Sequence, residues 1–328
     1  MRNIKFLIVK VFLLCLVIVF SISLSLFAAG EEYPNRTITA IIAAGVGGST
    51  DVSARILSEK LKVELGQPII IVNKKGGGGV IGLKYFLAEP TDGYTVCIMT
   101  NEGFQSAIST GIEPIDQDDF KYVGGYMMQA QIVIAHKNAP YKTFDELIAY
   151  AKENPGKLSI GSGGSVWALD IWKTIAINEG LKMNYVLFDS GADASANFLG
   201  GHVDIAQTGV GTAAYQAARA GDAIVLAKLG EGSVPGFANV PSTKELGYTE
   251  FEMNIPYGIF LHKEVPENIR EKWEQALKKV IEDPEIIAKM EKNGWVPQFI
   301  NSKKFEELNR GTVTSSIELL EYVKKLKE

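Results

Sequence analysis

The sequence has 328 residues, of which 46% are hydrophobic and 22% are charged, and it contains 33 glycines, 12 prolines and 2 cysteines. This composition is typical of a globular protein and excludes disorder, collagen and a disulfide-rich scaffold as the main state. The net charge of −5 argues against nucleic acid as a partner, because a phosphate backbone requires a basic face. At about 100 to 200 residues per domain, the length predicts two domains with a ligand site between them.

The first thirty residues have the pattern of a secretory signal peptide. Basic residues precede an apolar run that begins at Val11, and small residues close the segment at 28–30. We therefore expect an exported protein, periplasmic or otherwise extracytoplasmic, that begins near Glu31. The alternative is a retained membrane anchor, because residues 11–29 form a run of 19 that is long enough to span a bilayer.

Removal of residues 1–30 leaves a single cysteine and a more acidic protein. The segment carries three positive charges and no negative ones, so the net charge changes from −5 to −8. The remaining Cys97 lies in an apolar stretch, where a buried and inert thiol is expected.

The rest of the chain alternates strands with helices. Short β-rich runs are followed by glycine loops and then by apolar residues at helical spacing. The expected strands, in chain order, cover 37–42, 68–72, 94–99, 131–135, 158–160, 185–188, 203–206 and 223–226. Helices are expected between them, for example at 80–88 and, behind a capping box, at 143–152. Continuous apolar strands between helices predict a mainly parallel sheet that is covered on both faces.

The C-terminal part of the chain is expected to be mainly helical. Pro266 leads a segment whose apolar residues form one stripe, and Ser302 can cap another such segment. No period of about 20 to 50 residues repeats along the chain, which excludes solenoids and propellers.

Motifs for metal or covalent chemistry are absent from the sequence. The histidines lie far apart, at 136, 202 and 262, so no metal site and no cofactor are expected. Neither a Gly-x-Ser-x-Gly elbow nor a Walker loop occurs. The pattern Gly77-x-Gly79-x-x-Gly82 formally matches a dinucleotide fingerprint, but no acidic residue ends the following strand. A turn that brings backbone close to backbone is the favoured interpretation.

The loop at 47–51 gives the strongest indication of a ligand site. It follows a strand and opens a helix, and its residues are Gly47, Gly48, Ser49, Thr50 and Asp51. A helix N-terminus has N–H groups without intrahelical partners and a partial positive charge, so it binds an anion without a cationic side chain. Asp51 would repel a bound carboxylate unless Arg55, one turn later, neutralises it. An ordinary N-cap explains this loop equally well.

A second loop of the same kind favours the ligand interpretation. It also follows a strand and precedes a helix, and its residues are Ser162, Gly163, Gly164 and Ser165. Two such openings suit two domains that each offer a helix N-terminus to one cleft.

Further motifs accompany these loops in a distinctive order over nearly the whole mature chain. They are Tyr33-Pro34, Leu65-Gly66-Gln67-Pro68, Val72-Asn73-Lys74, Asp92-Gly93-Tyr94-Thr95, Leu199-Gly200-Gly201-His202-Val203-Asp204 and Val240-Pro241-Ser242-Thr243. Taken together, the set resembles the solute-binding proteins of tripartite tricarboxylate transporters, known as the Bug family.

This resemblance implies an α/β, periplasmic-binding-protein-like fold of two domains joined by crossing strands. The implied domains are 31–131 plus 256–328, and 132–255. They would close on a small carboxylate, such as a di- or tricarboxylate or a related organic or amino acid, and no chemical step would follow. The implied contacts are residues 47–51, residues 162–165 and, from a third loop, Asp189, Gly191 and Ala192. A monomer would deliver the ligand to the permease subunits of a tripartite transporter in the membrane.

Three positions depart from the family pattern. Ala44 and Val46 stand where many members have an aromatic residue and a proline, so the pocket wall is either smaller or filled by Trp167 or Met99. Asp189 stands where a basic or uncharged residue is common. An acid at this position favours a ligand with an amino group, unless it is simply an exposed loop residue.

Two other functions remain open on the sequence alone. One is a hydrolase that uses Ser162 or Ser165, although no motif places a histidine beside either serine. The other is a sensory carboxylate-binding protein that reports to a receptor kinase.

Overall fold

The structure, a computed structural model, describes residues 33–110, 115–163, 166–230 and 232–325. Contacts group Thr37–Glu328 into one unit and the residues up to Arg36 into another. The predicted signal peptide at 1–30 lies outside the described residues. In the part of the chain that is described, no helix has the length and apolar character needed to cross a membrane.

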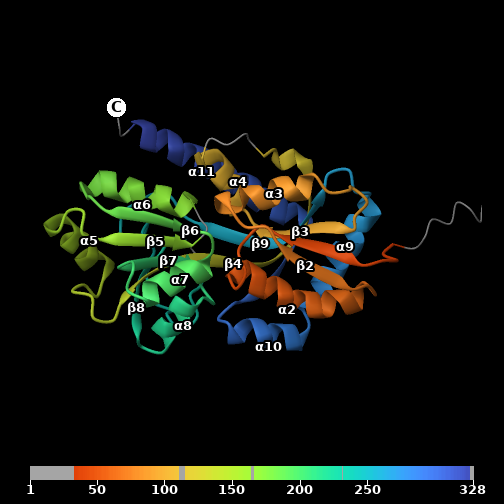
Figure 1. Cartoon of the computed structure of the whole chain (residues 1–328), viewed down its shortest axis with the longest axis horizontal. Helices are drawn as coiled ribbons and strands as arrows, with labels where there is room; N and C mark the ends of the chain where they lie inside the picture. The colour runs from red at the N-terminus through yellow and green to blue at the C-terminus, as the bar shows by residue number, and fades with distance from the viewer. Residues whose placement is uncertain (1–32, 111–114, 164–165, 231, 326–328) are drawn as a thin grey trace, which may run out of the picture. The chain divides into compact units, whose positions relative to one another are not determined.

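The first half of the chain alternates strands and helices as the sequence predicts (Figure 1). In order, the elements are β1 (Ile38–Ile42), α2 (Ser49–Glu64), β2 (Ile69–Asn73), η1 (Gly77–Gly79), α3 (Val80–Leu87), β3 (Thr95–Thr100), α4 (Glu102–Thr110), η2 (Gln117–Asp119) and β4 (Phe120–His136). Helix α4 and the first two-thirds of β4 were not predicted. The apolar stripe of α4 is short, and β4 contains the glycines Gly124 and Gly125, which interrupt a strand pattern.

The second half continues the alternation and ends in helices. Its elements are α5 (Phe144–Glu153), β5 (Ser159–Gly163), α6 (Val166–Glu179), β6 (Asn184–Phe188), α7 (Gly191–Leu199), β7 (Ile205–Gly209), α8 (Ala213–Arg219), β8 (Ala223–Lys228), β9 (Asn254–His262), α9 (Glu267–Ile281), α10 (Pro284–Lys292), β10 (Pro297–Asn301) and α11 (Ser302–Lys325). Strands β9 and β10 were missed by the sequence analysis. The predicted cap of α5 is confirmed, because Thr143 Oγ1 accepts a 3.2 Å hydrogen bond from Glu146 N.

The sheet is mixed, so the prediction of a mainly parallel sheet is wrong. β1 pairs in parallel with β2 and β3, and β5 pairs in parallel with β6 and β7. Strands β4 and β9 instead run antiparallel to each other and to their other neighbours, β3, β7, β8 and β10. The predicted α/β fold class is confirmed. The antiparallel pairings arise because the long strands β4 and β9 lie between the two groups of parallel strands.

Strand β4 connects the two groups of strands. Its first part pairs with β9 and β10, and its last residues pair with β7 and β8, for example Gln131 with Gly209. The predicted domain boundaries fall inside β4 and β9, at 131/132 and 255/256. Because contacts keep Thr37–Glu328 in one unit, the division into two domains stays a prediction.

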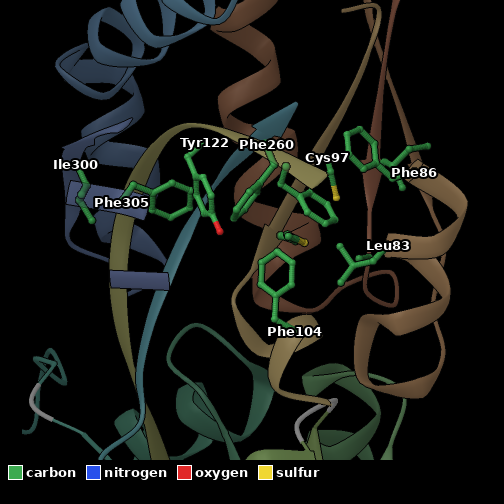
Figure 2. Packing of buried hydrophobic residues seen from close by; sticks show 12 residues of the cluster. Leu83, Phe86, Cys97, Phe104, Tyr122, Phe260, Ile300 and Phe305 are labelled. Atoms are coloured by element: carbon green, nitrogen blue, oxygen red, sulfur yellow. The ribbon is translucent and has the colours of Figure 1, made fainter. Parts of the chain in front are cut away.

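A cluster of aromatic side chains packs against β3, β4 and β9 (Figure 2). The ring centroids of Phe104 and Phe120 are 5.0 Å apart, as are those of Phe260 and Phe305. Cys97 is fully buried in this cluster, and burial raises the pKa of its thiol. The expectation of a buried thiol is therefore confirmed, and its raised pKa keeps it protonated and unreactive.

Gly258 on β9 lets strands β4 and β9 approach each other closely beneath the ring of Phe305. A Cβ atom at this position would lie 2.5 Å from Gly124 O and would also overlap the Phe305 ring. We expect Gly258→Ala to lower the free energy of unfolding by about 1–3 kcal/mol, because added bulk in a packed core forces side chains and backbone to move. Urea denaturation measures this change.

The matched control adds the same methyl group where space is open. Gly311 lies within α11 and a Cβ there has no atom within 4 Å. Gly311→Ala should raise stability by about 0.5–1 kcal/mol through helix propensity. Equal effects of the two substitutions would contradict the packing described for Gly258.

Candidate ligand-binding site

A cavity of about 60 Å³ lies where several loops meet at the ends of β1, β3, β5 and β7. Of the predicted site residues, those that line it are Gly48, Ser49, Thr50, Gly163, Asp189 and Gly191. Three further lining residues, Ala44, Met99 and Ser190, belong to the pocket wall or to the third loop that the resemblance implied. The lining residues that were not expected at the site are Ala43, Gly78, Gly79, Thr100, Glu102, Gly103, Gln131, Gly209, Thr212 and Tyr257. The three predicted loops therefore meet at one cavity, together with segments that were not predicted to belong to it.

Helices α2, α3, α4 and α7 all begin at this cavity. Gly48 is the N-cap of α2 and Gly79 is the N-cap of α3. Because glycine has no side chain, neither helix start is covered by a capping side chain at this position. Ser190 caps α7 by accepting from Asp193 N at 3.2 Å. Helix N-termini carry partial positive charge, so their convergence makes the cavity attractive to an anion.

Asp51 shapes the first loop from behind and does not line the cavity. Its carboxylate accepts from Gly47 N at 2.9 Å and from Asn73 Nδ2 at 3.0 Å, and it pairs with Arg55 at 2.8 Å. Asn73 Nδ2 also donates to Ala44 O at 3.2 Å. The Gly47 N–H is thus engaged within the loop, and Arg55 neutralises Asp51 as the sequence analysis required for a carboxylate site.

Ser49 links the first loop to the segment after β7. Its Oγ donates a 3.0 Å hydrogen bond to Val210 O, which also accepts from Gln129 Nε2 at 2.5 Å and from Trp295 Nε1 at 2.8 Å. Gln129 Oε1 in turn accepts from the hydroxyl of Tyr257 at 2.5 Å. The Ser49 hydroxyl group is consequently held in place, and its oxygen still has lone pairs to offer.

Ser162 is fully buried and is connected to the cavity by hydrogen bonds through Gln207 and Gln131. Its Oγ donates to Gln207 Oε1 at 2.6 Å, and Gln207 Nε2 donates to Gln131 Oε1 at 2.8 Å. Gln131 lines the cavity. The predicted neighbours Gly164 and Ser165 lie outside the described residues.

The third loop lies directly against the first and second loops. A Cβ atom on Gly163 would be 2.5 Å from Gly191 Cα, and one on Gly45 would be 2.9 Å from Ser190 Cβ. Ala192 lies beside Gly47, with 3.7 Å between its Cβ and the position of a Cβ on Gly47, and neither residue lines the cavity. The short distances at Gly163 and Gly45 leave no room for a side chain, which explains why both positions are glycine.

The glycine-rich segment 76–79 forms a further wall that sequence reasoning did not assign to the site. Gly79 has φ +102°, and a Cβ there would lie 3.2 Å from both Ala43 O and Gly103 Cα. The predicted close approach of backbone to backbone is therefore confirmed. The available signal was the repeated order of strand, glycine loop and helix, which this segment shares with the two selected loops.

Of the two side chains that were expected to fill the pocket wall beside Ala44, one lines the cavity. Met99 lines the cavity, whereas Trp167 is 1% exposed and is not among the described lining residues. Tyr257 contributes an aromatic ring from β9, a strand that the sequence analysis did not predict.

Asp51 should stabilise the fold in a pH-dependent way. Burial by itself would raise the pKa of Asp51, but hydrogen bonds from Arg55 and Gly47 N hold this pKa below its ordinary value. A lowered pKa stabilises the folded state above the ordinary value, and this contribution is lost as the pH falls through the folded-state pKa. We expect Asp51→Asn to cost about 1–2 kcal/mol at neutral pH, with a difference from wild type that narrows between about pH 5 and about pH 3.

Urea denaturation across this pH range measures the difference. Asp222→Asn is the control, because the Asp222 side chain is 71% exposed and its pairing with Lys137 is long at 3.9 Å. A cost for Asp51→Asn that does not vary with pH would contradict an ionised Asp51 in the loop.

Comparison with known proteins identifies the family. The model of the tripartite tricarboxylate transporter family receptor matches residues 53–324. The UPF0065 protein in the gbd 5′ region of Cupriavidus necator is 29% identical over 295 residues, which cover 90% of this chain and 89% of the relative. The chain belongs to the tripartite tricarboxylate transporter receptor family, so the resemblance to Bug proteins is confirmed.

Solved structures of similar fold include periplasmic binding proteins. BugD superposes with a TM-score of 0.79 at 25% identity, covering 89% of this chain and 99% of BugD. MatC of Rhodopseudomonas palustris, solved with bound malate, superposes with a TM-score of 0.75 at 21% identity, covering 90% of this chain and 100% of MatC. The periplasmic-binding-protein-like fold is therefore confirmed.

Proposed function

We propose that the protein is an exported solute-binding protein that captures a small carboxylate in the cavity and delivers it to a membrane permease. The observation that carries this proposal is the convergence of the N-termini of α2, α3 and α7 on a cavity lined, in the described residues, by no Lys, Arg or His. Backbone N–H groups and helix dipoles then provide the positive potential that a carboxylate needs.

The cavity volume supports a small ligand. One buried water needs roughly 10–15 Å³ on this scale, and the cavity measures about 60 Å³. The cavity therefore holds more than one water, and we propose that its ligand is a small molecule.

The burial of Ser162 argues against this residue as the nucleophile of a hydrolase. Its hydroxyl is fully buried and donates to Gln207 Oε1 at 2.6 Å, so it is not open to a substrate. No histidine is among the described residues that line the cavity. We therefore propose binding and release without a chemical step.

Membership of the receptor family supports the proposed partner and location. Receptors of tripartite transporters act with membrane permeases, so we propose permease subunits as partners and the periplasm as the location. MatC, which shares the fold, was solved with bound malate. We further propose that the mature protein is a monomer, with domains at 31–131 plus 256–328 and at 132–255.

We propose different roles for the predicted residues according to whether they line the cavity. Gly48, Ser49, Thr50, Gly163, Asp189 and Gly191 line the cavity and are proposed to contact the ligand. Gly47, Asp51, Ser162 and Ala192 are proposed to support these loops from outside the cavity, and Gly164 and Ser165 remain predicted contacts.

Gly48 offers the most direct test of the proposed function. Its φ of −73° suits any residue, and an added Cβ would make ordinary contacts of 3.8 Å with Ser190 Cβ and 3.9 Å with Gly191 N. Gly48→Ala should therefore fold normally but place a methyl group between the ligand and the N–H groups. We expect carboxylate affinity to fall by about 2 kcal/mol, roughly 30-fold in Kd.

Calorimetry and thermal shift with a panel of mono-, di- and tricarboxylates and amino acids measure this loss, since a ligand of the folded state raises the melting temperature. Gly311→Ala, which adds a methyl group at an open helix position, serves as the matched control. If a ligand that stabilises wild type binds Gly48→Ala equally well, the proposed contact at this loop is wrong.

A further inference from the structure

Gln131 presents the donor end of its side-chain amide to the cavity. The residue lies on β4, is 4% exposed and lines the cavity. Its Oε1 accepts a 2.8 Å hydrogen bond from Gln207 Nε2. Nothing in the described residues accepts a hydrogen bond from Gln131 Nε2, and this atom is not shielded from solvent. A buried amide N–H group normally has an acceptor, so the cavity side of Gln131 suits an oxygen atom of a ligand.

A chain of buried hydrogen bonds fixes which end of the Gln131 amide faces the cavity. Ser162 Oγ donates to Gln207 Oε1 at 2.6 Å, so Gln207 turns its Nε2 toward Gln131. Gln207 is 1% exposed and Ser162 is fully buried, so bulk water does not compete for these groups. An amide accepts at one end and donates at the other. With its Oε1 engaged by Gln207, Gln131 has donors to offer to the cavity.

Gln129, two residues earlier on the same face of β4, shows the contrasting case. Its Nε2 donates to Val210 O and its Oε1 accepts from the Tyr257 hydroxyl, both at 2.5 Å. Both ends of this amide are therefore used within the protein, and Gln129 does not line the cavity. Gln129 supports the wall, whereas Gln131 has one end available.

Several hydroxyl groups of the cavity wall already donate their protons within the protein. They are those of Ser49 to Val210 O, Thr100 to Glu102 Oε2, Ser190 to Asp193 Oδ2, Thr212 to Gly209 O and Tyr257 to Gln129 Oε1. A hydroxyl oxygen whose proton is used can still accept a hydrogen bond, whereas an amide N–H group can only donate. Gln131 therefore differs from these side chains in the kind of ligand group that it fits.

We propose that Gln131 is a specificity-determining residue that donates a hydrogen bond from its side chain to a second oxygen of the ligand, such as a carbonyl or carboxyl oxygen. The helix N-termini would hold the first carboxylate. A methyl group in place of the second oxygen leaves the Gln131 N–H unpaired, and an ammonium group there opposes donor to donor. Gln207 is a positioning residue, because it fixes the amide of Gln131. This inference rests on the proposed function of carboxylate capture.

Matched ligand pairs of equal charge test this selection in the wild-type protein. Pyruvate is compared with isobutyrate, and 4-oxopentanoate with 4-methylpentanoate, because each pair exchanges a carbonyl oxygen for a methyl group at similar size. Calorimetry at pH 7 should show at least tenfold tighter binding of the carbonyl compound in at least one pair, since the methyl compound leaves a buried donor unpaired. An advantage below tenfold in both pairs overturns the inference.

Gln131→Met tests the residue itself, because methionine is similar in length and has no N–H group. This variant should bind the tightest wild-type ligand from a panel of mono-, di- and tricarboxylates at least tenfold more weakly, and it should lose the preference for the carbonyl compounds. The same panel decides the case where wild type binds none of the four paired compounds. Gln275→Met, the same exchange at an exposed position of α9, is the control for the substitution.

Gln207→Met separates the donor from the hydrogen bonds behind it. It breaks the same buried chain but keeps the Gln131 amide, and Gln207 does not line the cavity. Gln131 is then free to turn either end to a ligand, so the ratio of the affinities for glutarate and γ-aminobutyrate should fall at least tenfold. A purely structural role of Gln207 would weaken both ligands equally, and that outcome contradicts its positioning role.

The possible failures can be told apart. If carboxylates bind wild type and Gln131→Met binds them equally well, the role of Gln131 is wrong while carboxylate capture stands. If wild type prefers γ-aminobutyrate to glutarate and Gln131→Met removes this preference, Gln131 faces the ligand with its oxygen and the inference is also wrong. If no carboxylate of the panel binds wild type, the proposed function fails and this inference fails with it.

Discussion

Close contact between backbones without Cβ atoms is the constraint on which the cavity depends. A Cβ atom on Gly163 would lie 2.5 Å from Gly191 Cα, and one on Gly79, which has φ +102°, would lie 3.2 Å from Ala43 O and Gly103 Cα. Any side chain at these points would push the loops apart. Because the loops carry helix N-termini, the same contacts that close the wall also bring the positive ends of α2, α3 and α7 together.

Charge around the cavity is arranged so that most acids are balanced outside it. Asp51 is held by Arg55, Gly47 and Asn73 behind the first loop, and Asp189 pairs with Lys75 at the rim. Neither acid cancels the backbone potential in the interior. Glu102 differs from both in its position, because it lies in the wall of the cavity itself.

Strands β4 and β9 each carry a residue that lines the cavity. β4 brings Gln131 to the cavity and β9 brings Tyr257, and the whole of β9 pairs with residues 120–130 of β4. Gln131 is linked through Gln207 to Ser162, so the second loop reaches the cavity through a chain of buried hydrogen bonds. Breaking one of these hydrogen bonds would leave a buried polar group without its partner, which costs free energy. The hydrogen bonds therefore hold the strands and the second loop in one arrangement.

The sequence by itself determined the features that local chemistry encodes. A strand followed by glycines and hydroxyl residues identified the loops at 47–51 and 162–165, and a separation of four residues on a helix indicated the pairing of Asp51 with Arg55. Family resemblance added the loop that contains Asp189. Only the tertiary structure decided that Glu102 and Tyr257 share the cavity with these loops, because their proximity depends on the register of β3, β4 and β9. Residues more than a hundred positions apart meet through strand pairing, and neither periodicity nor motif spacing specifies that pairing.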